Sequence, residues 1–229
     1  MAKLSELIIV ARDPSRLANF YRQVFELSVL AEHDREIVLS DGGVSLVFRN
    51  SADGQTPGLH AACFQGEDLT ELRKQLASKT EDRSASRGQL TDPDGNFIEI
   101  DEKVFKTAAT TSPFPIRHLA LYTPNPRRLA DFYGKMFNVR QVATSDRSSI
   151  FVSDGYFNLA LLFERPGEEK PGLNHFGLHV KDIEEMRDRA DKAGVPRGDK
   201  RPDRIPFAEY RLHDPEGNGI DISVKGWKV

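Results

Sequence analysis

An internal duplication constrains the fold of this chain more than any other feature of its sequence. The segment LSELIIVARDPSRLANFYRQVF at residues 4–25 and the segment PIRHLALYTPNPRRLADFYGKMF at residues 115–137 follow the same order. Each has a short apolar run, an Asp-Pro or Asn-Pro pair, the sequence Arg-Leu-Ala, and a Phe-Tyr pair. A self-match at a period of about half the chain predicts two similar halves.

Composition excludes several broad classes of protein. The net charge is −3 and the Lys and Arg residues are spread through both halves, so we expect no nucleic-acid partner. The first apolar run, residues 7–11, is too short for a signal peptide or a membrane span, and we expect a cytoplasmic protein with no membrane partner. The single cysteine, Cys63, has apolar neighbours, which predicts a buried thiol and not a nucleophile.

Local patterns divide each half into two β-α-β-β-β units. In the first unit, residues 7–10 predict a strand, and Asp13-Pro14 predicts the start of a helix with one apolar face. The motifs DPDGN at 92–96 and DPEGN at 214–218 predict the turn of the last hairpin of each half. We therefore predict an α+β fold of four such units. The predicted divisions are a first domain over residues 1–105, a linker over 106–114 and a second domain over 115–229.

The two halves differ at three registered strand positions. The second half holds at these positions His118, His175 and Asp221. The first half holds Glu6, Ala61 and Glu99. Two imidazoles and one carboxylate on three strands form the ligand set of an open mononuclear metal site, and strand alternation can turn all three to one face. His60 is one residue off this register, so neither it nor His33 is expected to be a ligand.

The segments RHLALYTPNPRRLADFY, GLNHFGLHVKD and HDPEGNGIDI resemble the vicinal oxygen chelate superfamily. This superfamily includes glyoxalase I, fosfomycin and bleomycin resistance proteins, and extradiol ring-cleavage dioxygenases. The resemblance covers all four units and implies two tandem domains of the glyoxalase type, each with a cupped mixed sheet. It also implies His118, His175 and Asp221 as metal ligands, although the family more often has Glu at the last position, and a first domain that has lost its ligands.

The resemblance also bears on the reaction. Glyoxalase-type members usually add a fourth ligand, a Glu, at the position that Ala160 occupies here. Three ligands leave coordination positions open, as Fe(II) enzymes that activate O2 require for a bidentate substrate and dioxygen. We therefore expect an Fe(II) dioxygenase similar to catechol 2,3-dioxygenases, acting with O2 on a small substrate that has vicinal oxygens.

The sequence leaves the acid or base of such a reaction open. Extradiol enzymes usually carry a His in the loop before the third strand of the last unit, but residues 199–207 contain none, and Arg211 stands where they have a Tyr. The candidates for acid or base are His179, Tyr210 and His213. The candidates for substrate binding are Tyr122, Arg204 and Arg211.

Two other functions stay open at this point. A lyase, isomerase or thiol transferase would use the same site with Mn, Ni, Zn or Mg to stabilise an enediolate or oxyanion. A metal-free protein of the bleomycin-resistance kind would sequester a ligand in the cups without chemistry. The sequence also leaves open whether the two halves pair within one chain or exchange across a homodimer.

Overall fold

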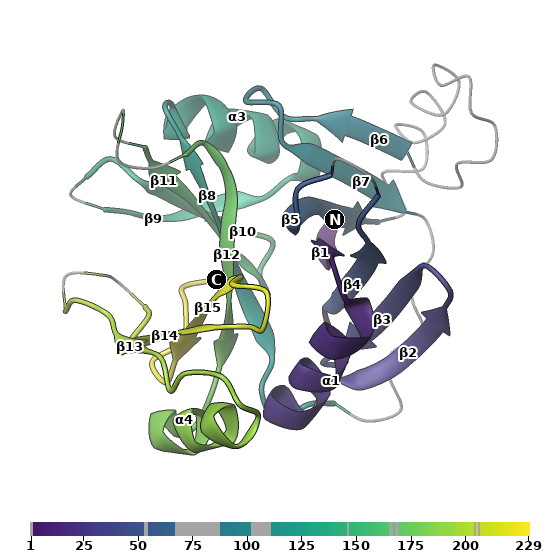
Figure 1. Cartoon of the computed structure of the whole chain (residues 1–229). Coiled ribbons are helices and arrows are strands. Elements are labelled where there is room, and N and C mark those ends of the chain that lie inside the picture. Colours follow the sequence, from purple (N-terminus) through teal and green to yellow (C-terminus); the bar gives the residue numbers. More distant parts are fainter. Residues whose placement is uncertain are drawn as a thin grey trace.

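A computed structural model describes residues 2–52, 55–66, 88–101, 111–145, 147–164, 167, 170–203, 205 and 207–229. Each half of the chain contributes one mixed β-sheet, and the two sheets lie side by side with helices packed at both ends of the contact (Figure 1). The predicted linker residues 106–110 and the predicted domain boundary at residue 105 lie outside the described residues.

The first sheet has seven described strands in the order β2-β3-β4-β1-β5-β7-β6. Their bounds are β1 (Lys3–Ala11), β2 (Ser28–His33), β3 (Glu36–Ser40), β4 (Ser45–Asn50), β5 (Gly58–Gln65), β6 (Gly88–Thr91) and β7 (Phe97–Asp101). The centre is the antiparallel pair β1 and β5, and each of these strands has a parallel neighbour on its other side. The helix predicted for the second unit falls on residues outside the described part of the chain.

The second sheet repeats this plan with eight strands in the order β13-β14-β15-β12-β8-β11-β10-β9. Their bounds are β8 (Ile116–Thr123), β9 (Arg140–Thr144), β10 (Ile150–Ser153), β11 (Asn158–Phe163), β12 (Gly172–His179), β13 (Asp199–Lys200), β14 (Tyr210–His213) and β15 (Gly219–Ser223). Its centre is the antiparallel pair β8 and β12, flanked by the parallel neighbours β11 and β15. The predicted α+β fold with two tandem cupped sheets is confirmed.

The described helices are α1 (Pro14–Phe25), α3 (Pro126–Phe137) and α4 (Ile183–Lys192). The first two begin as the duplicated motif predicts, with Asp13 and Asn125 accepting hydrogen bonds from backbone N–H groups of the first turn and Pro at the first helical position. Both end at a residue in the left-handed region, Glu26 and Asn138. The apolar faces of α1 and α3 are buried in the core between the sheets.

The halves pair within one chain, because α1 and α3 each pack against the sheet of the other half as well as their own. Phe137 of α3 stacks on Phe64 of β5 with ring centroids 4.0 Å apart. Tyr21 of α1 contacts Phe176 of β12 at 6.0 Å. One apolar core therefore runs through both halves.

Two reciprocal hydrogen bonds, one from α1 and one from α3, join these helices to the Asp-Pro turns of the opposite half. The hydroxyl of Tyr21 donates to Asp214 Oδ2 at 2.9 Å, and that of Tyr133 donates to Asp92 Oδ2 at 3.1 Å. Burial, and then the charge of Asp214, raise the pKa of Tyr21 well above its ordinary value, so the hydroxyl keeps its proton and acts as a donor. The DPDGN and DPEGN motifs thus have a second role beyond the turn itself.

A second reciprocal pair anchors the first strand of each half. Asp41 binds the N–H groups of its own turn through Oδ1, and its Oδ2 accepts from the backbone N–H of Ile116 at 2.5 Å. In the same way, Asp154 Oδ2 accepts from the backbone N–H of Leu4 at 3.0 Å. Ile116 is the first residue of β8, so a carboxylate of the first half fixes the start of the strand that carries His118.

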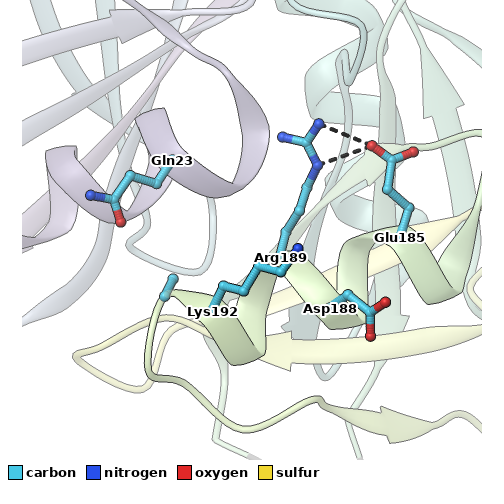
Figure 2. A pocket seen from close by; sticks show the side chains of 6 residues that line it. Gln23, Glu185, Asp188, Arg189 and Lys192 are labelled. Atoms are coloured by element: carbon cyan, nitrogen blue, oxygen red, sulfur yellow. Dashed lines mark hydrogen bonds and ion pairs between the residues drawn. The ribbon is translucent and has the colours of Figure 1, made fainter.

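A shallow hollow of about 470 Å³ lies between α1 and α4, lined mainly by polar side chains (Figure 2). Its Arg189 pairs with Glu185 on the same helix at 3.0 Å and with Glu26, just after α1, at 2.6 Å. The hollow therefore belongs to the contact between the halves. No helix in the described part of the chain is long and apolar enough to cross a membrane.

We predict that Tyr21→Phe and Tyr133→Phe each lower the free energy of unfolding by about 1–2 kcal/mol, because each leaves a buried carboxylate oxygen with one donor fewer. Urea denaturation followed by circular dichroism measures the change. Tyr210→Phe is the matched control, since among the described residues the Tyr210 hydroxyl makes no hydrogen bond. Equal stability of all four proteins would show that the reciprocal bonds contribute nothing.

Candidate metal centre

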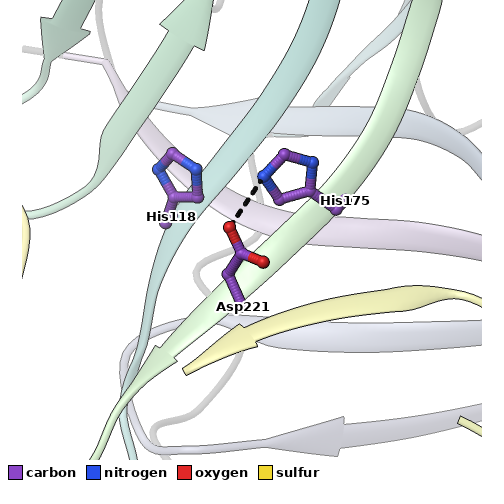
Figure 3. A group of neighbouring side chains, drawn as sticks. All are labelled: His118, His175 and Asp221. Carbon is purple, nitrogen blue, oxygen red and sulfur yellow. Dashed lines mark ion pairs between the residues drawn. The ribbon is translucent and has the colours of Figure 1, made fainter. Parts of the chain in front are cut away.

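Three neighbouring strands bring together the three residues that distinguish the second half. His118 is on β8, His175 on β12 and Asp221 on β15, and these strands are adjacent in the sheet. Figure 3 shows the three side chains pointing toward one another from the same face. One ligand atom of each lies within 4.8 Å of the others, and the three residues are only 4%, 4% and 2% exposed.

The ring nitrogens are oriented by two asparagines. His118 Nδ1 lies 2.9 Å from Asn158 Oδ1, and His175 Nδ1 lies 2.8 Å from Asn174 Oδ1. An amide oxygen accepts a hydrogen bond, so each Nδ1 carries the proton and each Nε2 presents a lone pair. Both imidazoles thus have the tautomer that a metal ligand binding through Nε2 requires.

The spacing of His175 and Asp221 also fits a cation. His175 Nε2 lies 3.2 Å from Asp221 Oδ2. Two ligand atoms bound at right angles to one ion at about 2.1 Å are about 3.0 Å apart. Both nitrogens of His175 face oxygen atoms, but a neutral imidazole has only one proton, and a cation beside Nε2 and Asp221 Oδ2 would satisfy the second contact.

Protonation states follow from burial and charge. Burial, and then the neighbouring His175, lower the pKa of His118 to about 3, and burial also lowers the pKa of His175. Burial alone would raise the pKa of Asp221, but His175 and Arg211 together hold it below its ordinary value. At neutral pH the cluster therefore consists of two neutral imidazoles and one carboxylate, which are the forms that bind a divalent metal ion.

Arg211 fixes the orientation of Asp221. Its Nε donates to Asp221 Oδ1 at 2.6 Å, and Arg201 Nε lies 3.9 Å from the same oxygen. The guanidinium contact occupies Oδ1 and leaves Oδ2 facing His175. Asp221 is thereby arranged to offer one oxygen, not two, to an ion.

The C-terminal segment covers His118. The ring of Trp227 stacks on that of His118, with centroids 5.0 Å apart and planes 8° apart. Asn158 ties this segment to the same histidine, since its Nδ2 donates to the carbonyl oxygen of Lys228 at 2.6 Å. Asn158 pairs with His118 in the parallel β8–β11 register, so knowledge of this strand pairing would be enough to place Asn158 beside His118. Trp227 follows the last strand, and no sequence pattern predicts its position.

A pocket of about 680 Å³ contains the cluster. Ala160, where the resemblance led us to expect a fourth ligand in glyoxalase-type members, lines this pocket and places only a methyl group there. The full lining is His118, Tyr122, Ala143, Thr144, Ser145, Arg147, Ser149, Phe151, Ala160, Leu162, Phe163, His175, Arg201, Pro202, Ile205, Phe207, Asp221, Trp227 and Lys228. The cluster is therefore reached from a cavity large enough for a small organic molecule.

Residues 116–222 match the family model of the Glyoxalase/Bleomycin resistance protein/Dioxygenase superfamily. This part of the chain belongs to that superfamily. The matched segment includes all three residues of the cluster, and the predicted membership of the vicinal oxygen chelate superfamily is confirmed. No curated protein sequence matches the chain.

Solved structures of dioxygenases share the tandem fold. The 2,3-dioxygenase LapB from Pseudomonas sp. KL28 is 17% identical with a TM-score of 0.72, and the match covers 99% of this chain and 93% of that one. An extradiol ring-cleaving dioxygenase from B. fuscum is 18% identical with a TM-score of 0.70, over 99% and 72% of the two chains. The 2,2′,3-trihydroxybiphenyl 1,2-dioxygenase from Sphingomonas wittichii is 15% identical with a TM-score of 0.68, over 96% and 89%. At these identities the likeness is one of fold.

The other candidate residues are distributed unevenly around the pocket. Tyr122 lines it, and Arg211 contacts Asp221. The acid and base candidates do not line it: the His179 ring is exposed with Nε2 lying 3.0 Å from the carbonyl oxygen of Val224, and Tyr210 packs under Arg187 beside α4. His213 is exposed at the end of β14. Arg204 lies outside the described residues.

The first half of the chain shows how the equivalent position is stabilised without histidines. Glu99, which corresponds to Asp221, accepts two hydrogen bonds from the Arg49 guanidinium at 2.6 and 3.1 Å. Arg49 Nε donates to Glu36 at 2.8 Å. The guanidinium of Arg49 thus compensates the charge of the buried Glu99 carboxylate. Among the described residues, the second half holds the one cluster with metal-ligand spacing.

We predict that His118 makes the metal-free protein less stable in acid. Its pKa is lowered from 6.5 to about 3 on folding, so below pH 6.5 the unfolded state takes up a proton that the folded state does not. Stability is full above pH 6.5 and falls as the pH drops toward the folded-state value, by about 1.4 kcal/mol per pH unit.

Urea denaturation with EDTA between about pH 6 and pH 4.5 measures this slope. His118→Asn is expected to lower this slope by about 1.4 kcal/mol per pH unit, which is the contribution of one proton. His33→Asn, which removes an exposed histidine, is the control and is expected to keep the wild-type slope. An unchanged slope in His118→Asn would mean that His118 is not held neutral by burial.

Proposed function

We propose that the chain is a mononuclear Fe(II) dioxygenase that uses O2 to cleave a small substrate with vicinal oxygens, as extradiol ring-cleavage enzymes do. The observation that carries the proposal is the cluster of His118, His175 and Asp221 in a pocket where Ala160 takes the place of a fourth ligand. Two histidines and one carboxylate with open positions are the ligand set of Fe(II) oxygenases.

The residues present suit this ion by their chemistry. His118 and His175 would hold it through Nε2, with Asn158 and Asn174 keeping the rings oriented, and Asp221 would hold it through Oδ2. When bound, Fe(II) supplies a Lewis acid and a template with open positions for vicinal oxygens and dioxygen. Extradiol cleavage breaks the ring C–C bond next to the diol and places both atoms of O2 in the product, so it needs no further reductant.

Tyr122 is the group that we assign to proton movement. A general acid or base must come within hydrogen-bond reach of the reacting group, and Tyr122 lines the pocket whereas His179, Tyr210 and His213 do not. Phe151 and Phe207, whose rings meet edge to face at 5.5 Å, add an apolar wall that excludes water from the reacting centre.

Metal binding is expected to quench the fluorescence of Trp227, the sole tryptophan, because its ring stacks on that of His118. Titration of anaerobic, metal-free protein with Fe(II) or Co(II) is expected to saturate at one equivalent. His118→Ala and Asp221→Ala are expected to weaken metal binding at least ~10-fold, since loss of a residue that only hydrogen-bonds to a metal ligand already weakens binding by about that much. His33→Ala is the control.

Two results would contradict the proposal. The first is a purified protein that holds only a small fraction of an equivalent of any transition metal, unchanged by His118→Ala. The second is a metal-loaded protein that takes up no oxygen with any member of a panel of catechols. Turnover of 2-oxo substrates by Mn, Ni or Zn protein without oxygen uptake would instead support a lyase or isomerase.

Tyr122→Phe is expected to lower the rate of oxygen uptake about 10²-fold with a smaller change in KM, which is the usual share of a positioned acid or base. Oxygen-electrode kinetics across the pH range measure both constants. Tyr210→Phe removes the same hydroxyl outside the pocket and is expected to leave them unchanged. Equal effects of the two substitutions would remove Tyr122 from the mechanism.

A further inference from the structure

Arg211 lies directly beside Asp221 in the second sheet. The two residues are paired in the antiparallel β14–β15 register, and Arg211 Nε donates to Asp221 Oδ1 at 2.6 Å. The Arg211 side chain is only 17% exposed, and its buried Nη2 has no hydrogen-bond partner among the described residues. In the same part of the chain, no carboxylate other than that of Asp221 lies within ion-pair distance of Arg211. The charge of this guanidinium therefore acts on one carboxylate alone.

The partners of the two histidines add no negative charge to the cluster. The amide oxygens of Asn158 and Asn174 lie 2.9 and 2.8 Å from the Nδ1 atoms of His118 and His175. A carboxylate in that place, as many metal sites have, would increase the basicity of the ring. Apart from Asp221, the described residues that line the pocket include no Asp or Glu. The negative charge near the cluster is thus the single charge of Asp221.

The charges of the three proposed ligands and Arg211 sum to zero. A histidine that binds a metal ion is neutral, and the guanidinium cancels the carboxylate. Two histidines and a carboxylate without such a partner carry one negative charge, which offsets part of the charge of a bound ion. Here Fe(II) would add two positive charges, and Fe(III) three, to a group that is almost removed from solvent. Each further positive charge costs more in such an environment, so the arrangement disfavours the oxidised ion.

The first half of the chain has a neutral residue at the equivalent position. Gln89 pairs with Glu99 across β6 and β7, in the place that Arg211 has in β14. The cation that binds Glu99 is Arg49, which comes from β4 and is shared with Glu36 at 2.8 Å. Within the described residues, a guanidinium given to one last-strand carboxylate alone is therefore particular to the half that holds the metal-ligand cluster.

We propose that Arg211 is a positioning residue that keeps the iron in the Fe(II) form, because its charge on Asp221 raises the Fe(III)/Fe(II) reduction potential of the site. The proposal rests on the proposed function, since it takes iron as the bound ion. In the reaction that Arg211 opposes, Fe(II) gives one electron to O2, Fe(III) stays in the protein and superoxide leaves. A carboxylate that shares its charge with a guanidinium donates less electron density to the ion. Arg211 thereby protects the resting protein from oxidation before a substrate binds.

The reduction potential of anaerobic, iron-loaded protein without substrate tests this role. Arg211→Gln introduces the residue that the first half has at the equivalent position. It is expected to favour Fe(III) over Fe(II) at least ~10-fold more than wild-type protein does, which lowers the one-electron potential by at least ~59 mV. Spectroelectrochemistry with mediator dyes measures this value. The potential depends on the ratio of the two affinities, so a looser Asp221 that weakens both equally has no effect on it.

Three further variants separate charge from orientation. Arg211→Lys keeps the positive charge and is expected to keep the Fe(III)/Fe(II) ratio within about 3-fold of wild type. Arg211→Met is a second uncharged variant, expected to shift the potential as Arg211→Gln does, and it replaces that variant if Arg211→Gln does not fold. Arg16→Gln removes an exposed cation from α1 and is expected to change nothing. An unchanged potential in the uncharged variants would overturn the proposal, as would an equal fall in Arg211→Lys.

Oxygen uptake separates this inference from the proposed function. A potential that falls in Arg211→Gln but not in Arg211→Lys, in iron-loaded protein that takes up no oxygen with any catechol, would support the role of Arg211 and contradict the dioxygenase. Oxygen uptake by wild-type protein whose potential equals that of Arg211→Gln would support the dioxygenase and contradict the role of Arg211. Failure of wild-type protein to bind Fe(II) at all would contradict both.

Discussion

The register of β8, β12 and β15 is the constraint on which the candidate metal centre depends. Gly177 of β12 lies opposite His118 on one side and Asp221 on the other, so a single strand aligns both neighbours. A shift of one residue would turn a ligand from the pocket face to the core face. Gly177 also has to be small, because a Cβ there would lie 2.6 Å from the Trp227 ring. Gly177 therefore allows both the alignment of the strands that carry His118 and Asp221 and the close packing of Trp227.

The first half of the chain holds this register in place. Asp41 binds the first residue of β8, and Tyr21 binds Asp214 in the turn that precedes β15. Both contacts cross between the halves and both involve buried carboxylates, whose loss of hydration has to be offset by hydrogen bonds. The first half, whose described residues include no cluster with metal-ligand spacing, thus has a structural reason to be retained beside the second half.

The two halves compensate a buried carboxylate on the last strand in different ways. Glu99 receives two hydrogen bonds from Arg49, one at each carboxylate oxygen. Asp221 receives one from Arg211, and its second oxygen faces His175. Breaking a buried pair leaves an uncompensated charge, so each arrangement tolerates little change once formed. Asp221, with one hydrogen bond from Arg211, lies beside the two histidines, whereas Glu99, with two hydrogen bonds from Arg49, has no histidine at the registered positions.

The sequence alone determined the repeated unit, the helix starts at Asp13 and Asn125, and the set of His118, His175 and Asp221. These depend on local capping, on apolar periodicity and on the alignment of one half with the other, all of which are written in the order of the residues. The tertiary structure decided which other side chains share the pocket. Strand alternation predicts that His179, two positions beyond Gly177 on β12, points to the same face as His175. Its ring instead lies at the exposed strand end beside the Val224 carbonyl and outside the pocket lining. Arg201, Trp227 and Asn158 reach the cluster from a loop, the C-terminal segment and a neighbouring strand. The pairing of β8 with β11 accounts for Asn158, whereas the proximity of Arg201 and Trp227 arises from sheet curvature and chain path, which no local pattern encodes.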